Sequence, residues 1–259
     1  MVKGMYIGVS GTARKIKKGY IGVDNLARKV KKGYLGVSGV ARLIYSGEQE
    51  LSYYGTATAL SVARHSLAAA SIGNYVLAMG GYVDDGSAVV DAYNTSLQRS
   101  TPTALIVARY QLAAASVGDY VLAMGGGTST SNSSIRATVD AYNTSLQRST
   151  PAALSVARRQ LAAASVGDYA LAMGGDTSSS KSAVVNAYNT SLQRSTPAAL
   201  SAARRELAAA SVGDYVLAMG GTAGSYSAVV DAYDTSLQRS TPAALSVARR
   251  QLAAASVGD

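Results

Sequence analysis

A pattern of two short apolar runs separated by a turn recurs along most of the chain. In residues 112–126, LAAASVGDYVLAMGG, the runs LAAAS and YVLAM flank Gly118-Asp119, and two glycines end the second run. Short runs around a two-residue turn that contains glycine are typical of a β-hairpin. The second run carries apolar or aromatic residues on both faces, which indicates a strand covered on both sides. Copies of the pattern occupy residues 67–81, 161–175 and 207–221, and a partial copy occupies residues 252–259.

The hairpin belongs to a longer repeat. Its glycine pairs are spaced by 45, 49 and 46 residues and lie at residues 80–81, 125–126, 174–175 and 220–221. Each unit holds four strand-sized pieces, named A to D here: LAAAS, YVLAM, AVVDAY and a piece within LQRSTPAALSVA. One proline marks the expected start of each piece D, where an outer strand tolerates a missing N–H: Pro102, Pro151, Pro197 and Pro242. Four strands at this period predict an all-β fold, a β-propeller.

Three residue types in each unit resemble the kelch repeat. In the second unit they are Arg109 before strand A, Gly125-Gly126 after strand B and Tyr142 in strand C. The tryptophan that kelch repeats carry after the tyrosine is absent, and Leu146 is the nearest bulky residue. Leucine also stands three residues after the arginine, where kelch repeats often have histidine. The resemblance implies a propeller of four full four-stranded, kelch-like blades with partial strands at each end.

The two ends of the repeat region are unequal. Residues 51–64 match piece D, and residues 252–259 match strand A, but no pieces B and C accompany that last strand. A blade made from these ends would be incomplete. The sequence therefore predicts a propeller that is incomplete at its C-terminus. It is completed by further sequence, which we expect, or by another chain, or it stays open.

The N-terminal region has a different repeat, of 14 residues. The copies are YIGVSGTARKIKKG, YIGVDNLARKVKKG and YLGVSGVARLIYSG at residues 6–19, 20–33 and 34–47, and each predicts a small β-hairpin. Residues 1–47 hold ten Lys or Arg and one acid, whereas residues 48–259 hold 14 of each sign. We therefore divide the chain into basic hairpin repeats at 1–47 and a propeller at 48–259. Tandem Y-I-G-V-x-x-x-A-R units resemble short repeats of Firmicute prophage proteins.

Composition excludes several classes of function. The chain has no cysteine and one histidine, so neither a cysteine-based site nor a histidine-rich metal centre can form. Galactose-oxidase-like propellers resemble kelch repeats, but their copper chemistry needs histidines and a cysteine-linked tyrosine. We expect no enzyme activity, metal or cofactor. The N-terminus lacks an apolar signal region, and no apolar run is long enough to span a membrane.

Comparison of the units separates constant from variable positions. One variable set follows each glycine pair, between strands B and C. The other is the residue pair after each arginine, at 65–66, 110–111, 159–160, 205–206 and 250–251. In a meandering blade both connections emerge at one end, so we expect one variable face that binds a ligand. The candidate residues are Tyr82, Asp84, Asp85, Tyr110, Asn132, Arg136, Arg159, Asp176, Lys181, Arg205 and Tyr226. Neutral drift in solvated loops is the alternative.

The constant arginines have a structural interpretation. Arg64, Arg109, Arg158, Arg204 and Arg249 occupy one position of the repeat. We expect their guanidinium groups to bind carbonyls and the strand C residues Asp91, Asp140, Asn186 and Asp231. A ring of arginines could also meet an acidic sugar or a phosphate.

These observations favour a non-enzymatic phage or prophage protein of the tail-fibre or receptor-binding type. Its propeller would present the variable face to a host-surface glycan or protein, and its basic repeats would attach it or form a homo-oligomer, such as a trimer. It would reside in the virion, or in the cytoplasm before lysis. Lysine-rich strand faces account for the basic region without nucleic acid. The alternatives are an intracellular kelch-type protein–protein interaction scaffold and a glycan-active enzyme using Asp84, Asp85 and Asp176.

Overall fold

The computed structural model describes six strands between residues 5 and 46, and residues 56–131 and 134–256. The chain divides into two compact units, Met1–Thr56 and Ala57–Asp259. In the described part of the chain, no helix is long and apolar enough to cross a membrane.

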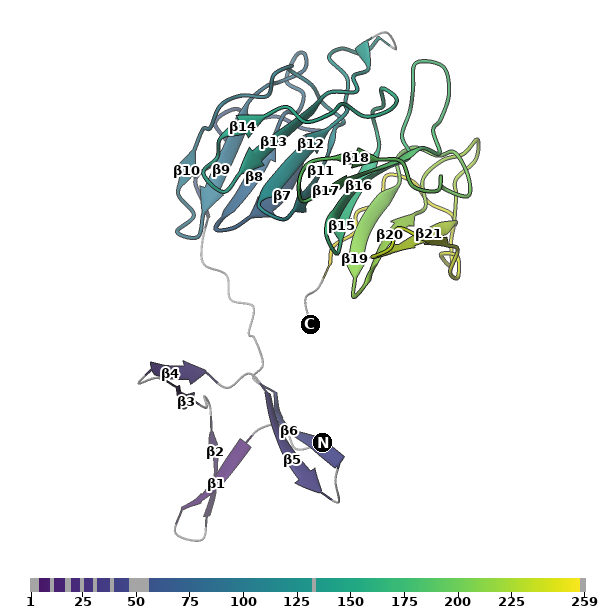
Figure 1. The fold of residues 1–259 in the computed structure, drawn as a ribbon. Coiled ribbons are helices and arrows are strands. Elements are labelled where there is room, and N and C mark those ends of the chain that lie inside the picture. Colours follow the sequence, from purple (N-terminus) through teal and green to yellow (C-terminus); the bar gives the residue numbers. More distant parts are fainter. Residues whose placement is uncertain are drawn as a thin grey trace. The chain divides into compact units, whose positions relative to one another are not determined.

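The first unit contains three antiparallel hairpins, as the 14-residue repeats predict (Figure 1). In each hairpin the Gly-Val end of the first strand pairs with the start of the second; Val9 lies opposite Thr12, and Val23 opposite Leu26. The strands are β1 (Met5–Val9), β2 (Thr12–Ile16), β3 (Tyr20–Val23), β4 (Leu26–Lys29), β5 (Lys32–Val37) and β6 (Val40–Ser46).

The second unit consists of four antiparallel sheets of four strands each, numbered first to fourth along the chain, as the repeat predicts (Figure 1). The first sheet contains β7 (Ala68–Ile72), β8 (Tyr75–Met79), β9 (Val90–Asn94) and β10 (Arg99–Ser100). The second contains β11 (Ala113–Val117), β12 (Tyr120–Met124), β13 (Val139–Asn143) and β14 (Arg148–Ser149). The third contains β15 (Ala162–Val166), β16 (Tyr169–Met173), β17 (Val185–Asn189) and β18 (Arg194–Ser195). The fourth contains β19 (Ala208–Val212), β20 (Tyr215–Met219), β21 (Val230–Asp234) and β22 (Arg239–Ser240).

The hairpin of strands A and B forms as predicted in every sheet. Val117 pairs with Tyr120 across Gly118-Asp119, and Gly118 has a φ of 50°. A positive φ at the first turn residue is favourable for glycine and matches the twist of an antiparallel pair. This explains why glycine opens the turn in every unit.

The core lies between neighbouring sheets. We call the face that each of the first three sheets packs on the next sheet along the chain the forward face. The opposite face, which packs on the sheet before in the second to fourth sheets, is the backward face. Between the second and third sheets, Leu122 and Met124 of the forward face pack with Ala170, Ala172 and Tyr188 of the backward face. Equivalent clusters fill the other two contacts between sheets. The B strands β12 and β16 are therefore covered on both sides, as predicted.

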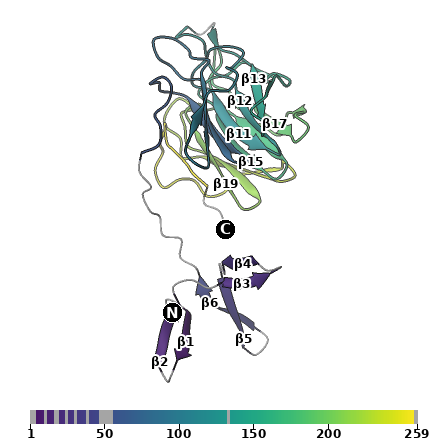
Figure 2. The same ribbon diagram turned by 90° about the vertical axis from the view of Figure 1, so that its left-hand side faces the viewer.

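The A strands lie together along the axis of the fan of sheets, and β11, β15 and β19 run side by side (Figure 2). Serine side chains join them: Ser165 Oγ donates to the carbonyl of Ser116, and Ser211 Oγ donates to the carbonyl of Ser165 at 2.6 Å. Alanine allows this close approach of inner strands, as expected from the sequence.

Strand D differs from the prediction. It contains only an Arg-Ser pair, such as Arg148–Ser149, and Pro151 follows the strand instead of starting it. Strand D is still the outer edge of its sheet. Because proline has no N–H to donate, it is compatible with the irregular segment that runs to the next sheet.

The partial strand expected at the C-terminal end is also corrected. The described residues 252–256 contain no strand, although they match piece A; at the other end, the residues equivalent to the Arg-Ser strand D are 54–55, which lie outside the described residues. A strand forms through its paired neighbour, and none of the described strands pairs with residues 252–256. The C-terminal copy of LAAAS is therefore irregular.

Four of the five constant arginines bind their own sheet as predicted, whereas Arg249 is exposed and donates to the carbonyl of Val247. Arg204 lies in the segment that enters the fourth sheet, and its Nη1 donates to Asp231 of β21 at 2.7 Å. Its Nη2 donates to the Ala218 carbonyl at 2.9 Å, and its own carbonyl accepts a hydrogen bond from Gly175. A Cβ at the preceding Gly174 would lie 2.6 Å from the same carbonyl. The glycine pair thus makes room for the segment that carries the arginine.

Arg64 binds Asp91 and Arg109 binds Asp140 in the same way, with fully buried side chains. In the third sheet Arg158 donates to Asn186 at 2.7 Å instead. Burial lowers the pKa of Arg158 to about 10. Burial opposes ionisation of Asp231, but hydrogen bonds from Arg204 and Ser201 outweigh it and lower the pKa of this carboxyl.

Candidate functional site

The structure brings the two variable sets together, as the sequence predicts. In each of the four sheets, the first residue of the variable pair exchanges backbone hydrogen bonds with the residue that follows the glycine pair of that sheet. Tyr110 and Gly127 donate to each other's carbonyls at 3.0 and 2.9 Å, and Arg159 and Asp176 do so at 3.0 and 2.7 Å. His65 with Tyr82 and Arg205 with Thr222 repeat the arrangement. The two connections therefore form one end of the second unit.

The second residue of each variable pair turns toward the axis. We call these five the axial residues: Ser66, Gln111, Gln160, Glu206 and Gln251. All five have φ values between 52° and 56°, a left-handed conformation that is uncommon for residues other than glycine. Each N–H from Gln111 onward donates to the carbonyl of the axial residue before it, at 2.9 to 3.0 Å. The backbone thus links the units around the axis.

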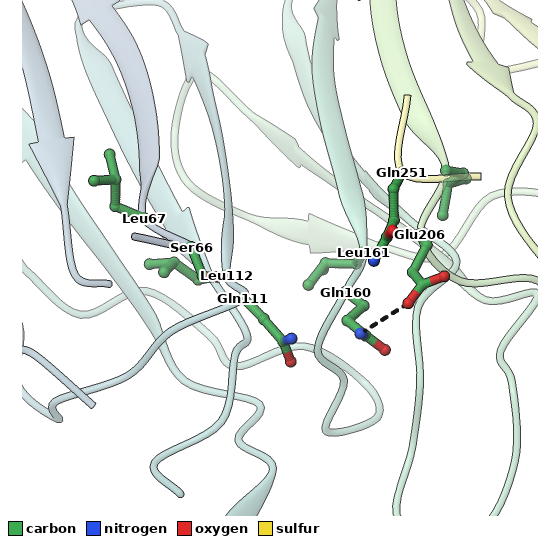
Figure 3. A pocket seen from close by; sticks show the side chains of 9 residues that line it. Ser66, Leu67, Gln111, Leu112, Gln160, Leu161, Glu206 and Gln251 are labelled. Carbon is green, nitrogen blue, oxygen red and sulfur yellow. Dashed lines mark hydrogen bonds between the residues drawn. The ribbon is translucent and has the colours of Figure 1, made fainter. Parts of the chain in front are cut away.

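The axial residues surround a cavity of about 230 Å³, here called the axial cavity. Leucines that follow them complete its lining, from Leu67 to Leu207. Figure 3 shows Gln160 and Glu206 facing each other, and Gln160 Nε2 donates to Glu206 Oε1 at 3.2 Å. Arg250 Nη1 donates to Glu206 Oε2 at 3.2 Å. Gln160 Oε1 is buried and has no hydrogen-bond partner among the described residues.

An aromatic cluster lies on the side of the first and second sheets. The ring of Tyr82 lies between His65, at 5.3 Å between centroids, and Tyr110, at 4.9 Å in an edge-to-face arrangement. Tyr110 is buried, and its hydroxyl donates to the Ser129 carbonyl at 3.0 Å. Tyr110 therefore supports the loop more than it offers a free contact.

A charged cluster lies on the side of the third and fourth sheets. Asp176 Oδ2 lies 3.0 Å from Nη1 of Arg205 and 3.9 Å from Nε of Arg159. The backbone of Lys181 forms a bridge with Asp176. Two cationic side chains thus share one carboxylate beside the axial cavity.

The remaining candidates do not join these clusters. Asp84 and Asp85 are exposed in their own loop, where Asp85 accepts a hydrogen bond from the backbone of Gly86. Tyr226 is exposed and lies under the guanidinium of Arg250, 5.3 Å from its ring centroid. Arg136 is half-buried in its loop. Asn132 lies outside the described residues.

The sequence candidates left out the axial residues themselves. Gln111, Gln160 and Glu206 are the second members of variable pairs whose first members, Tyr110, Arg159 and Arg205, are among the candidates. Their variation between units was visible in the sequence. Their direction was not, because a left-handed backbone at a non-glycine residue has no sequence signal here.

A second cavity, of about 370 Å³, is lined by the alanines and serines of the A strands, such as Ala115, Ser116 and Ser165. It repeats the same small side chains, so it offers little to select one ligand over another. The axial cavity instead combines amide groups, a carboxylate and nearby arginines. Such groups can donate and accept hydrogen bonds with a polar ligand. Within the described residues, no group of three His, Asp or Glu side chains could hold a metal ion.

Comparison with known proteins supports the fold. No protein-family model matches the chain, and no curated protein matches it. A solved structure described as "Structure of YjhT" is similar, with a TM-score of 0.60 and 14% sequence identity, over 73% of this chain and 68% of that one. The chain therefore has a propeller-like repeat fold of four-stranded antiparallel sheets.

Proposed function

We propose that the chain is a non-enzymatic binding protein that recognises a polar ligand at the axial cavity. Five axial residues adopt a left-handed backbone that favours glycine, yet the sequence places Ser, Gln, Gln, Glu and Gln there. Such strain costs about 1–3 kcal/mol at each residue and is often found at functional sites. The proposal depends on these polar side chains, because they line the axial cavity.

The structure contains an internal comparison for this argument. Leu97, Leu146, Leu192 and Leu237 are also left-handed. Three of them, Leu146, Leu192 and Leu237, pack against the core between sheets, so burial offsets their strain. The axial glutamines belong to none of these apolar clusters. Hydrogen bonds between axial main chains offset their strain, and their side chains, which line the cavity, are the groups to which we assign polar recognition.

The ligand that we favour is a host-surface glycan, with the chain acting as a phage or prophage tail-associated receptor-binding protein in the virion. Amide and carboxylate groups at the axial cavity suit a polyhydroxylated ligand. The resemblance of the 14-residue repeats to prophage proteins supports the biological setting.

The alternative is an intracellular scaffold that binds an acidic protein segment. Arg159, Arg205 and Arg250 lie beside the axial cavity and favour this function. These arginines already contact Asp176 and Glu206, which offsets part of their charge.

The test uses the whole chain and two immobilised panels, bacterial surface polysaccharides and acidic peptides. Glu206→Gln with Gln160→Ala is expected to reduce polysaccharide binding by about tenfold or more, because each lost hydrogen bond to a charged group weakens binding by about 1.5–3 kcal/mol. Arg194→Ala is the control, since Arg194 is exposed and its Nη1 donates to the hydroxyl of Thr196, two residues further along the chain. Binding that the double variant leaves unchanged contradicts the proposal. Retention of acidic peptides alone, lost in Arg205→Ala, favours the scaffold.

A further inference from the structure

The two outermost faces of the row of four sheets are uncovered. Val76 of the first sheet is 48% exposed, whereas its equivalents Val121, Ala170 and Val216 are completely buried. These equivalents lie on the backward faces, each against the sheet before. The backward face of the first sheet is therefore apolar and open.

The fourth sheet is open on its other side. Val212 is 59% exposed, whereas Ile72, Val117 and Val166 are buried against the next sheet. Tyr215 is 48% exposed, and its equivalents are partly covered by the next sheet. The forward face of the fourth sheet therefore lacks the partner that every other forward face has.

The turns between strands A and B lie at the edge of this contact, and they also show that the fourth sheet lacks a neighbour. A Cβ at Gly73, Gly118 or Gly167 would lie 3.0 to 3.5 Å from a threonine methyl group of the next sheet. A Cβ at Gly213, the equivalent turn of the fourth sheet, would have no neighbour within 4 Å. The threonine that such a turn would contact on the first sheet is Thr95, the equivalent of Thr144, Thr190 and Thr235.

We propose that the two open faces bind each other between copies of this chain, so that the protein assembles head to tail. The forward face of the fourth sheet would take the backward face of the first sheet of a second copy, with Val76 packed near Leu217 and Met219 as Val121 packs near Leu77 and Met79. The units are nearly identical in sequence, so this contact repeats one that the chain already makes three times. Such a contact pairs two different surfaces and forms rings or filaments.

A segment of the chain itself occupies part of the contact. Residues 241–256 repeat residues 56–71 except at Pro242, Ala243, Arg250 and Gln251. They lie along the fourth sheet as each connecting segment lies along the sheet before it; Leu245 and Arg249 donate to the carbonyls of Ala228 and Ser227, at 2.8 and 3.0 Å.

An incoming first sheet brings its own segment 56–71, so one of the two equivalent segments must leave. In the incoming copy, β7 is fully paired with β8, whereas residues 252–256 form no strand. Residues 242–256 are therefore the ones displaced. Their displacement weakens the contact between copies.

The experiment measures the mass of the 259-residue chain by sedimentation across a concentration series. Val76→Glu and Val212→Glu are each expected to raise the dissociation constant by about tenfold or more, because the contact would bury a charge without a partner. Ile106→Glu is the matched control, since Ile106 is 53% exposed and lies on neither open face. Association through residues 1–47 is common to all variants and leaves the comparison intact.

Two further measurements test the head-to-tail arrangement. Each Glu variant keeps one intact face, so a mixture of the two should form a 1:1 dimer that neither forms alone. Deletion of residues 242–259 should lower the dissociation constant, because the competing segment is gone. A chain that stays monomeric at all concentrations, a mixture that forms no dimer, or equal weakening by Ile106→Glu would overturn the proposal. Association that is lost after the deletion would overturn it too.

Discussion

The third and fourth sheets hold a buried arginine in the same position but give it different partners. Arg204 binds the carboxylate of Asp231, which also binds Arg239 at 2.9 Å. Arg158 binds the amide of Asn186, whose Nδ2 donates to Ser155 and Thr196. Both arginines also bind carbonyls of their sheet.

This difference separates two roles of the arginine. The carbonyl contacts are common to all sheets and join the connecting segment to the sheet. The ion pair is an addition, which the third sheet lacks although it keeps the same strand order and register. We infer that the carbonyl contacts define the geometry, and that the carboxylate mainly compensates the charge.

Replacement of the buried arginines should change the free energy of unfolding most. Arg204→Ala leaves Asp231 buried with one arginine fewer and should lower the free energy of unfolding by about 3–5 kcal/mol. Arg158→Ala leaves only neutral groups without a donor and should cost about 1–3 kcal/mol. Urea denaturation of the two variants at pH 7 measures the difference. Equal losses would mean that the carboxylate contributes nothing beyond the carbonyl contacts.

A smaller effect is expected when the missing carboxylate is restored. Asn186→Asp places a charge 2.7 Å from Arg158 and should raise the free energy of unfolding by about 1–2 kcal/mol at pH 7. Asn189→Asp in the same sheet is the control, because it adds the same charge in a turn where the fourth sheet already has Asp234. A gain as large in the control would show a general charge effect.

The smallest expected effect is the loss of stability at low pH. Because the folded state lowers the pKa of Asp231 below its ordinary value of 3.8, the stability from this ion pair is present above that value and is lost as the pH falls through the lowered pKa. The carboxylate of Asn186→Asp should behave in the same way. Its advantage over the unchanged chain should therefore shrink below about pH 4, as urea midpoints at pH 7, 5 and 3 would show. A constant advantage would contradict this account.

The sequence was sufficient for features that depend on local chemistry. Gly118 marks the turn because of its positive φ, and Arg204 and Asp231 are opposite charges at constant positions of the repeat that meet in a buried sheet. Both were predicted. The repeat itself revealed the number of sheets, since each unit is one sheet.

Other features depend on contacts between units and could not be predicted. Strand D is short because pairing ends before a proline, and the sequence does not show at which residue the pairing begins. Gln160 has a left-handed backbone because its N–H bonds to the unit before it. The composition rules for turns expect glycine or asparagine there.

The hydrogen bonds around the axis have a consequence for how this surface can change. The main chain of each axial residue joins the units, so the side chain is free to vary without loss of that bond. Recombination between near-identical repeats could therefore exchange one unit for another and alter the axial cavity by one side chain at a time. Such a protein would acquire new binding preferences by reordering modules, with the scaffold unchanged.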